Sequence, residues 1–265
     1  MLNIFEKIGI RVQGWIHITT EFLNLLFETL YWIFLGPFKD KPIKRPTVFE
    51  QMVFMGASSI VIVFFVTLFT GVVLAMQSAY QLSKMGAVMY VASLVSVSVC
   101  RELGPVLTAL VLAGRIGAAI TAEIGSMKVN EQIEALDVMA INPVRFLVVP
   151  KLLALFFMLP CLTVIGDLSG IIGGYIIGVF NLKINAALYV QTTFKYLTLK
   201  DIYTGLSKSF VFAIIIVMVG CYQGLRTKGG AVGVGKATTV SVVTSFILII
   251  VADCVITGFY YFSNL

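Results

Sequence analysis

The 265-residue chain is 59% hydrophobic and 12% charged, and its formal net charge is +6. This composition excludes a single water-soluble domain and indicates a protein with several membrane-spanning segments. The basic residues lie at the ends of apolar runs, where the positive-inside bias and anionic headgroups account for them, so nucleic-acid binding is not expected.

The first segment, residues 2–34, repeats apolar side chains every three or four positions between charged ones. This spacing predicts an amphipathic helix whose charges are too frequent for a span, so we expect it to lie in the membrane interface or on the flank of the bundle. A basic linker follows, with Lys39, Lys41, Lys44 and Arg45. Residues 1–48 are therefore predicted to precede a transmembrane domain over 49–265.

Five largely apolar runs are long enough to cross a hydrocarbon core of about 30 Å at about 1.5 Å per residue. They are Val53–Met76, Leu103–Ala122, Leu152–Phe180, Ser209–Leu225 and Thr239–Phe262. For Gln77–Cys100 we expect a turn and a short or re-entrant helix near the outer surface. The predicted fold class is an all-α polytopic membrane protein with an interfacial helix and about five transmembrane helices.

Charge asymmetry orients these spans. Roughly twice as many lysines and arginines fall on one side as on the other, and the richer side is expected to be cytoplasmic. The amino terminus is then inside and the carboxyl terminus outside, with an inverted arrangement as the alternative.

Three ionisable residues, Arg115, Asp167 and Asp253, lie inside the predicted spans. Each costs about 2.5 to 3.5 kcal/mol at the middle of a membrane unless it is paired or hydrated. One interpretation is structural pairing between helices, and the other is a proton or ion relay. Their spacing does not select between the two.

The adjacent charges Arg101 and Glu102 stand at the outer end of the second span, before Gly104 and Pro105. Consecutive helical side chains point about 100° apart, so each charge needs a partner elsewhere. The planar guanidinium of Arg101 suits a phosphate, whereas Glu102 suits an ammonium headgroup or a neighbouring helix.

An alternative is that Arg101 pairs with Asp167 or Asp253 and only locks the bundle. If the charges bind lipid, apolar walls for the acyl chains are expected from Leu74 and Leu103, with Gln77 at the mouth of the cavity.

An acidic stretch follows the second span, where basic residues are usual. Its acids are Glu123, Glu131, Glu134 and Asp137, against the single cation Lys128. Apolar residues recur in it at helical spacing, so an amphipathic surface helix is predicted. A protein partner is the favoured interpretation, and a helix resting on headgroups is the alternative.

The segment Gly230–Ala237 comes close to a phosphate-binding P-loop. Ala237 replaces the Ser or Thr that would hold magnesium, however, and the segment joins two spans instead of following a strand. We interpret it as a glycine-rich turn, so any ATP must be bound by a separate subunit. Four scattered cysteines and the single His17 predict neither a metal site nor a cofactor.

Several of these stretches resemble the MlaE (YrbE) family of ABC-transporter permeases. The matching segments are Arg101–Pro105, Gly114–Arg115, Thr121–Gly125, Glu131–Gln132, Ala135–Leu136, Asn142–Pro143, Gly233–Gly235 and Ala237–Thr239. The resemblance covers most of the chain beyond about residue 50.

The resemblance implies a non-enzymatic, homodimeric permease subunit without catalytic residues in the cell inner membrane, with the plastid inner envelope also compatible. Such a subunit moves phospholipid between that membrane and an outer-side MCE-type lipid carrier, driven by a cytoplasmic ABC ATPase. Residues 124–140 would be the coupling helix. The implied ATPase contacts are Glu131, Gln132, Ala135 and Leu136.

The resemblance also places Arg101, Glu102 and their neighbours around an outward-open lipid cavity at the dimer interface. Two other function classes stay open, an ion-coupled secondary transporter and a membrane-embedded lipid-modifying enzyme. Scattered acids and one histidine outside the spans disfavour the enzyme, and the absence of paired broken helices disfavours the secondary transporter.

Overall fold

The computed structural model describes residues 2–36 and 45–262, which are almost entirely helical and contain no strand. The α-helices are α1 (Leu2–Phe34), α2 (Arg45–Met55), α3 (Ile60–Lys84), α4 (Val91–Ser98), α5 (Gly104–Leu112), α6 (Ala118–Val129), α7 (Gln132–Val138), α8 (Val149–Ile176), α9 (Ala186–Tyr196), α10 (Leu199–Leu225) and α11 (Gly230–Phe262). The predicted linker cations Lys39, Lys41 and Lys44 lie outside the described residues, as do the side chains of residues 2–12.

Short turns of other helix types join these elements. The 3-10 turns are η2 (Ala57–Ser59) and η3 (Val88–Tyr90), and the π-helical turns are η4 (Val99–Leu103), η5 (Ala113–Gly117), η6 (Val144–Val148) and η7 (Ile177–Asn181). A π turn accommodates an extra residue in the helix and changes which way the side chains around it point.

Within the described ranges, five helical stretches are long and apolar enough to cross a membrane. They are Arg45–Lys84, Val88–Val129, Val144–Asn181, Leu199–Leu225 and Gly230–Phe262. The predicted all-α polytopic membrane fold with five spans is therefore confirmed. Each stretch is longer than predicted, because a helix satisfies its own backbone hydrogen bonds and continues past the apolar run that marks the hydrocarbon core.

The predicted turn and short helix after the first span are both present. The helix α3 ends at Lys84, and Gly86 takes a left-handed φ of 70° that suits glycine. The short helix α4 is not re-entrant, because it continues through η4 into α5 and α6 as one spanning helix. Pro105 does not break this helix, since it lies in the first turn of α5 directly after the π turn.

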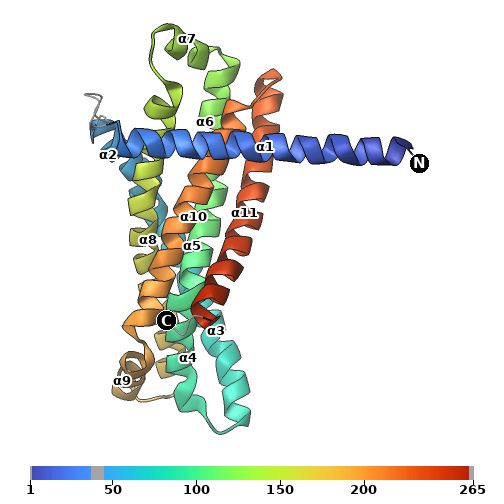
Figure 1. Ribbon diagram of the computed structural model, residues 1–265. Helices are drawn as coiled ribbons and strands as arrows, with labels where there is room; N and C mark the ends of the chain where they lie inside the picture. The colour runs from blue at the N-terminus through green and yellow to red at the C-terminus, as the bar shows by residue number, and fades with distance from the viewer. Residues whose placement is uncertain (1, 37–44, 263–265) are drawn as a thin grey trace.

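The spanning helices form one elongated bundle, and α1 lies across it (Figure 1). The helix α8 occupies a central position and packs on α2, α3, α5 and α10, whereas α11 packs on α6 and α10. The small helix α7 caps one end of the bundle, and α9 lies at the other (Figure 1). These are called the α7 end and the α9 end below.

The predicted helix over residues 2–34 is present as α1 and packs on the flank of the bundle. Leu25 is buried there, and the Glu21 carboxylate lies 3.4 Å from Arg226 on α10. The amide of Asn142 donates to the Glu28 carboxylate at 2.8 Å. Phe27 and Phe34 are 65% and 68% exposed, so α1 also carries apolar side chains that do not face the bundle.

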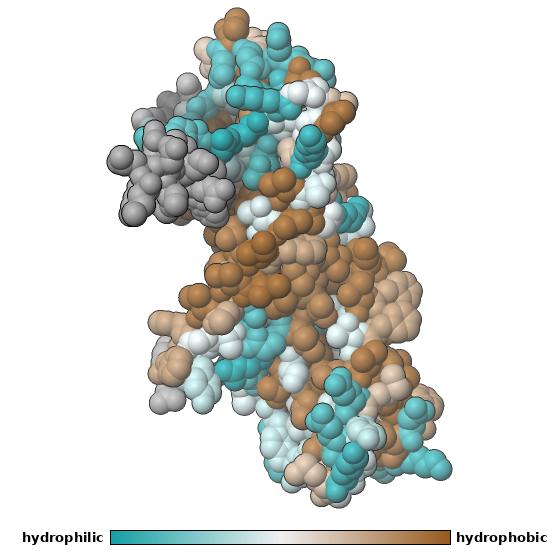
Figure 2. Space-filling model, turned by 90° about the vertical axis from the view of Figure 1, so that its right-hand side faces the viewer, coloured by the Kyte–Doolittle hydropathy of each residue, from teal (hydrophilic) through white to brown (hydrophobic). Residues whose placement is uncertain are grey.

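Glycines on α8 permit its close contact with α3, as expected of packing devices in membrane helices. A methyl group added at Gly71 would lie 2.0 Å from the carbonyl oxygen of Gly170, and one at Gly173 would lie 2.2 Å from that of Leu68. On the face that Figure 2 shows, mainly apolar side chains cover the surface between the two more hydrophilic ends.

We predict that Gly71→Ala destabilises the bundle, because its methyl group would force α3 away from α8. The expected cost is about 1–3 kcal/mol, the usual range for overpacking. Gly258→Ala is the matched control, since nothing lies within 4 Å of the added methyl group on α11. Thermal unfolding in detergent should show a lower midpoint for Gly71→Ala alone. Equal midpoints for the two variants would contradict the close contact.

Candidate functional site

The π turn η4 carries the adjacent charges Arg101 and Glu102 about a third of the way along the spanning helix Val88–Val129, and not at its end as predicted. Val99 and Cys100 in the same turn are buried, whereas the two charged residues are half-buried. The charges contact different parts of the chain, as their angular separation on a helix predicts.

Arg101 pairs with Asp201 at the start of α10, with 3.6 Å between Nη1 and Oδ1. The other carboxylate oxygen of Asp201 accepts hydrogen bonds from the backbone N–H and the hydroxyl of Thr198, at 3.0 and 2.7 Å, and so caps α10. The alternative pairing of Arg101 with Asp167 or Asp253 is therefore wrong. The Arg101 side chain remains 35% exposed beside its partner, so it is not sealed inside the bundle.

Glu102 binds Lys208 of α10, whose side chain has no exposed surface. The Lys208 ammonium also donates to the hydroxyl of Thr257 at 2.7 Å and lies 2.8 Å from the carboxylate of Asp253, both on α11. Thr257 in turn donates to Glu102 at 3.3 Å. We call Glu102, Lys208, Asp253 and Thr257 the Lys208 cluster, and it joins η4 to α10 and α11.

Lys208 and Asp201 belong to this site, although the sequence does not predict them. The fourth span is predicted to begin at Ser209, which leaves both residues in a loop. In the structure α10 begins at Leu199, and two helical turns separate the acid from the lysine on the same helix face. The sequence does contain a signal for this pairing. Asp201 and Lys208 lie seven residues apart, and their charges are opposite to those of Arg101 and Glu102, respectively.

The predicted apolar walls lie on two neighbouring elements. Leu74 on α3 is half-buried and packs on a small core cluster that contains Val99 of η4, and Leu103 is half-buried at the end of η4 itself. Gln77 is exposed one turn further along α3. The structure therefore brings Leu74 close to the π turn and leaves Gln77 at the surface.

Arg115 lies in the second π turn of the same spanning helix, η5. Its guanidinium donates to the hydroxyls of Ser59 and Ser58, the latter at 2.9 Å, and forms no ion pair among the described residues. Arg115 also lines an open hollow of about 470 Å³ together with Ile62, Leu110 and Phe246. These bonds favour structural pairing for Arg115.

The two intramembrane acids differ from each other. Asp253 has Lys208 as its ion-pair partner. Asp167 is 7% exposed, and its Oδ1 has no hydrogen-bond partner in the described part of the chain. Structural pairing therefore describes Asp253 but leaves Asp167 without an explanation.

The predicted coupling helix over 124–140 is divided into two elements. The end of α6 turns at Glu131, which adopts a left-handed φ of 58°, and α7 then runs over Gln132–Val138. Glu131, Gln132 and Ala135 are exposed, whereas Leu136 is buried with Ile133 and holds α7 on the bundle.

Two further side chains stand out on this surface. Val138 and Met139 are 88% and 60% exposed at the end of α7, and the sequence analysis did not select them. The Lys128 ammonium binds the Glu134 carboxylate and holds the pKa of that carboxyl below its ordinary value. Glu134 is therefore negatively charged at neutral pH, and α7 presents acidic and apolar groups together.

The glycine-rich segment is helical and does not form the turn that we expected. The turn falls at Gly229, with a φ of 87°, and the glycines from Gly230 onward form the first turns of α11. The segment begins α11 and does not follow a strand.

Comparison with known proteins agrees with this arrangement. The profile of the family Permease MlaE matches residues 48–259. A probable ABC transporter permease protein of Rickettsia conorii is 43% identical over 261 residues, which cover 98% of this chain and 99% of the relative. A probable ABC transporter permease protein of Synechocystis is 40% identical over 211 residues, covering 80% of each chain.

A third relative is a probable ABC transporter permease protein, ycf63, of Pyropia yezoensis. It is 34% identical over 250 residues, covering 94% of this chain and 93% of the relative. The family profile spans all five membrane helices of this chain. The chain therefore belongs to the MlaE permease family and is a multi-pass membrane protein of the ABC-transporter permease type.

Proposed function

We propose that the chain is the permease subunit of an ABC transporter that moves phospholipid between the inner membrane and an MCE-type lipid carrier on its outer side. The observation that carries this proposal is α7, a short helix beyond the end of the bundle with exposed acidic and apolar side chains. Such a helix suits insertion into a groove on a partner protein. The partner is a cytoplasmic ABC ATPase, which binds the ATP.

In this proposal the α7 end is cytoplasmic, and so is the amino terminus. The helix α1 lies in the plane of the membrane interface, where Phe27 and Phe34 bury their rings among lipid. Residues 1–48 then anchor the permease domain of residues 49–265. The α9 end faces the compartment that holds the carrier.

The working unit is a homodimer. Only a small share of α11 is buried within one copy, and Val243, Ile247 and Ile250 on it are more than half exposed. The helix α3 likewise exposes Phe65 and Phe69. A second copy packed on these faces would enclose a lipid path that one copy leaves open.

The lipid is held at the π turn η4. Arg101 is the group that meets the phosphate, because its guanidinium offers several donors and its side chain is not sealed by Asp201. Leu74 and Leu103 contact acyl chains, and Gln77 lies at the mouth. Glu102 has the different task of holding Lys208, so it positions η4 without meeting the headgroup.

The function class is tested by ATP hydrolysis. We expect the purified chain alone to hydrolyse no ATP, and its complex with the ATPase subunit to hydrolyse ATP faster in phospholipid vesicles than in detergent. Lipid transfer to the carrier should require ATP. Transfer that follows an ion gradient without ATP would instead identify a secondary transporter.

Charge reversal on α7 tests the coupling. The double variant Glu131→Lys/Glu134→Lys should lower the amount of copurified ATPase about tenfold, because it opposes charge complementarity at the docking surface. Glu50→Lys, at an exposed position on α2, is the control. Full ATPase recovery with the double variant would contradict docking through α7.

Replacement of Arg101 tests the lipid site. Arg101→Gln should reduce lipid transfer by about tenfold or more through loss of charged hydrogen bonds, with little change in unfolding temperature. Lys84→Gln removes an exposed cation at the end of α3 as a control. Photocrosslinkers at Leu74 and Leu103 should capture phospholipid more than one at Leu188. Capture at Leu188 alone would show that the lipid cavity lies elsewhere.

A further inference from the structure

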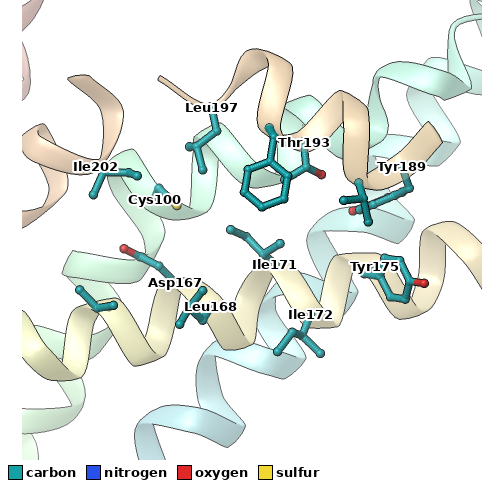
Figure 3. Close-up of a pocket in the computed structure, with 13 residues that line it drawn as sticks. Cys100, Asp167, Leu168, Ile171, Ile172, Tyr175, Tyr189, Thr193, Leu197 and Ile202 are labelled. Carbon is teal, nitrogen blue, oxygen red and sulfur yellow. The ribbon is translucent and has the colours of Figure 1, made fainter. Parts of the chain in front are cut away.

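A slot that is open on one side lies between α8 and α9. Its volume is about 350 Å³, within the size range of small-molecule sites, and its lining is almost wholly apolar. Leu168, Ile171 and Ile172 line it from α8, and Leu197 and Thr193 line it from the segment of α9 (Figure 3).

The slot exists because α9 packs on α4 and leaves a gap toward α8. Tyr189 bridges this gap at one end, where its ring lies against Gly174 and Gly178 and 5.5 Å from the ring of Tyr175. Asp167 and Cys100 lie at the opposite end (Figure 3). From Asp167 to Tyr175 the slot is about 12 Å long, at about 1.5 Å of rise per residue.

Three residues that line the slot each carry a buried polar atom without a hydrogen-bond partner among the described residues. These atoms are Oδ1 of Asp167, Oγ1 of Thr193 and the hydroxyl of Tyr189. Their residues are 7%, 4% and 2% exposed, respectively. An unsatisfied buried polar group is costly, and three beside one cavity point to a partner that the chain itself does not supply.

The lining restricts the chemistry of that partner. No lysine or arginine of the described residues lines the slot, and the carboxyl group of Asp167 disfavours an anionic headgroup. An ester carbonyl can accept from Thr193 or Tyr189, and a free hydroxyl can donate to Asp167. A hydrocarbon chain fits the remaining apolar wall.

One side of the slot opens at the molecular surface between apolar side chains. Leu168, Ile172 and Phe194 are 56%, 48% and 74% exposed there. A ligand can therefore enter sideways from the bilayer, with its polar end inside and the rest of its chain among the surrounding lipid.

We propose that this slot binds an uncharged glycerolipid with a free hydroxyl group, of the diacylglycerol class. The hydroxyl donates to Asp167 and an ester carbonyl accepts from Thr193 or Tyr189. The site adjoins the phospholipid path at Arg101, because Cys100 and Ile202 line the slot beside Arg101 and Asp201, but binding there does not depend on ATPase coupling.

Photolabelling of the full-length chain in phosphatidylcholine vesicles tests this assignment. The probe is diacylglycerol with a diazirine in its acyl chain, and the comparison probe is phosphatidic acid with the same chains. Diacylglycerol should label peptides from residues 168–175 and 190–197 at least about fivefold more than phosphatidic acid, because the slot offers no cation to a phosphate. Equal labelling by both probes would overturn the proposal.

Two variants localise the label. Ile171→Trp fills the slot and should abolish labelling, whereas Ile176→Trp, at a lipid-exposed position of α8 outside the slot, should not. Thr193→Val keeps the shape of the side chain and removes the unpaired hydroxyl. It should reduce labelling on the order of fivefold, the equivalent of about one hydrogen bond.

The unfolding temperature of Thr193→Val separates a ligand group from a structural one. Without lipid the variant should unfold at the same or a higher temperature, because it removes an unsatisfied buried group. A lower temperature would assign the hydroxyl to the fold and overturn the proposal. Labelling that persists in both Ile171→Trp and Thr193→Val would overturn it as well. So would a crosslinker at Phe194 that captures a partner protein's helix and no lipid in native membranes.

Discussion

The organisation of the α9 half of this permease depends on compensation of one buried positive charge. Lys208 has no exposed surface, and an ammonium group in an apolar bundle is tolerated only with anionic and hydrogen-bonding partners. Glu102 and Asp253 supply the charge and Thr257 the additional acceptor. Because these partners come from η4 and α11, the second, fourth and fifth spanning helices are held together at one point. Loss of one member of such a buried pair typically costs about 3–5 kcal/mol.

The second spanning helix is anchored in the same way near its other end. Lys151 on α8 is almost fully buried, and its ammonium lies 2.7 Å from the carboxylate of Glu123 on α6. The helix from Val88 to Val129 thus accepts a buried lysine from a neighbour on each side of its middle. It is consequently a firmly held connection between the π turn η4 and the helix α7, the two features that the proposed transport cycle must link.

The sequence predicts the membrane fold well because span length and apolar composition are set by the bilayer. It predicts side-chain partners less well. Arg101 pairs with Asp201 because α10 begins at Leu199, and the sequence does not predict that starting point. Leu136 fits an apolar stripe on a coupling helix, but such a stripe does not say whether the side chain faces this chain or a partner. The slot between α8 and α9 could not be predicted from the sequence, because it results from the packing of α9 on α4.

The three ionisable residues inside the predicted spans, Asp253, Arg115 and Asp167, differ in the partners that the chain provides for them. Asp253 is neutralised within the chain, and Arg115 is solvated by two serine hydroxyls. A buried polar group that only stabilises the fold is expected to have a hydrogen-bond or ion-pair partner, because without one it destabilises the folded state. Among the described residues, Asp167 has neither an ion-pair partner nor a hydrogen bond to its Oδ1, and the hydroxyls of Thr193 and Tyr189 beside the same cavity also lack hydrogen bonds. The stability argument that accounts for Asp253 and Arg115 therefore points outside the chain for Asp167, toward a molecule supplied by the membrane.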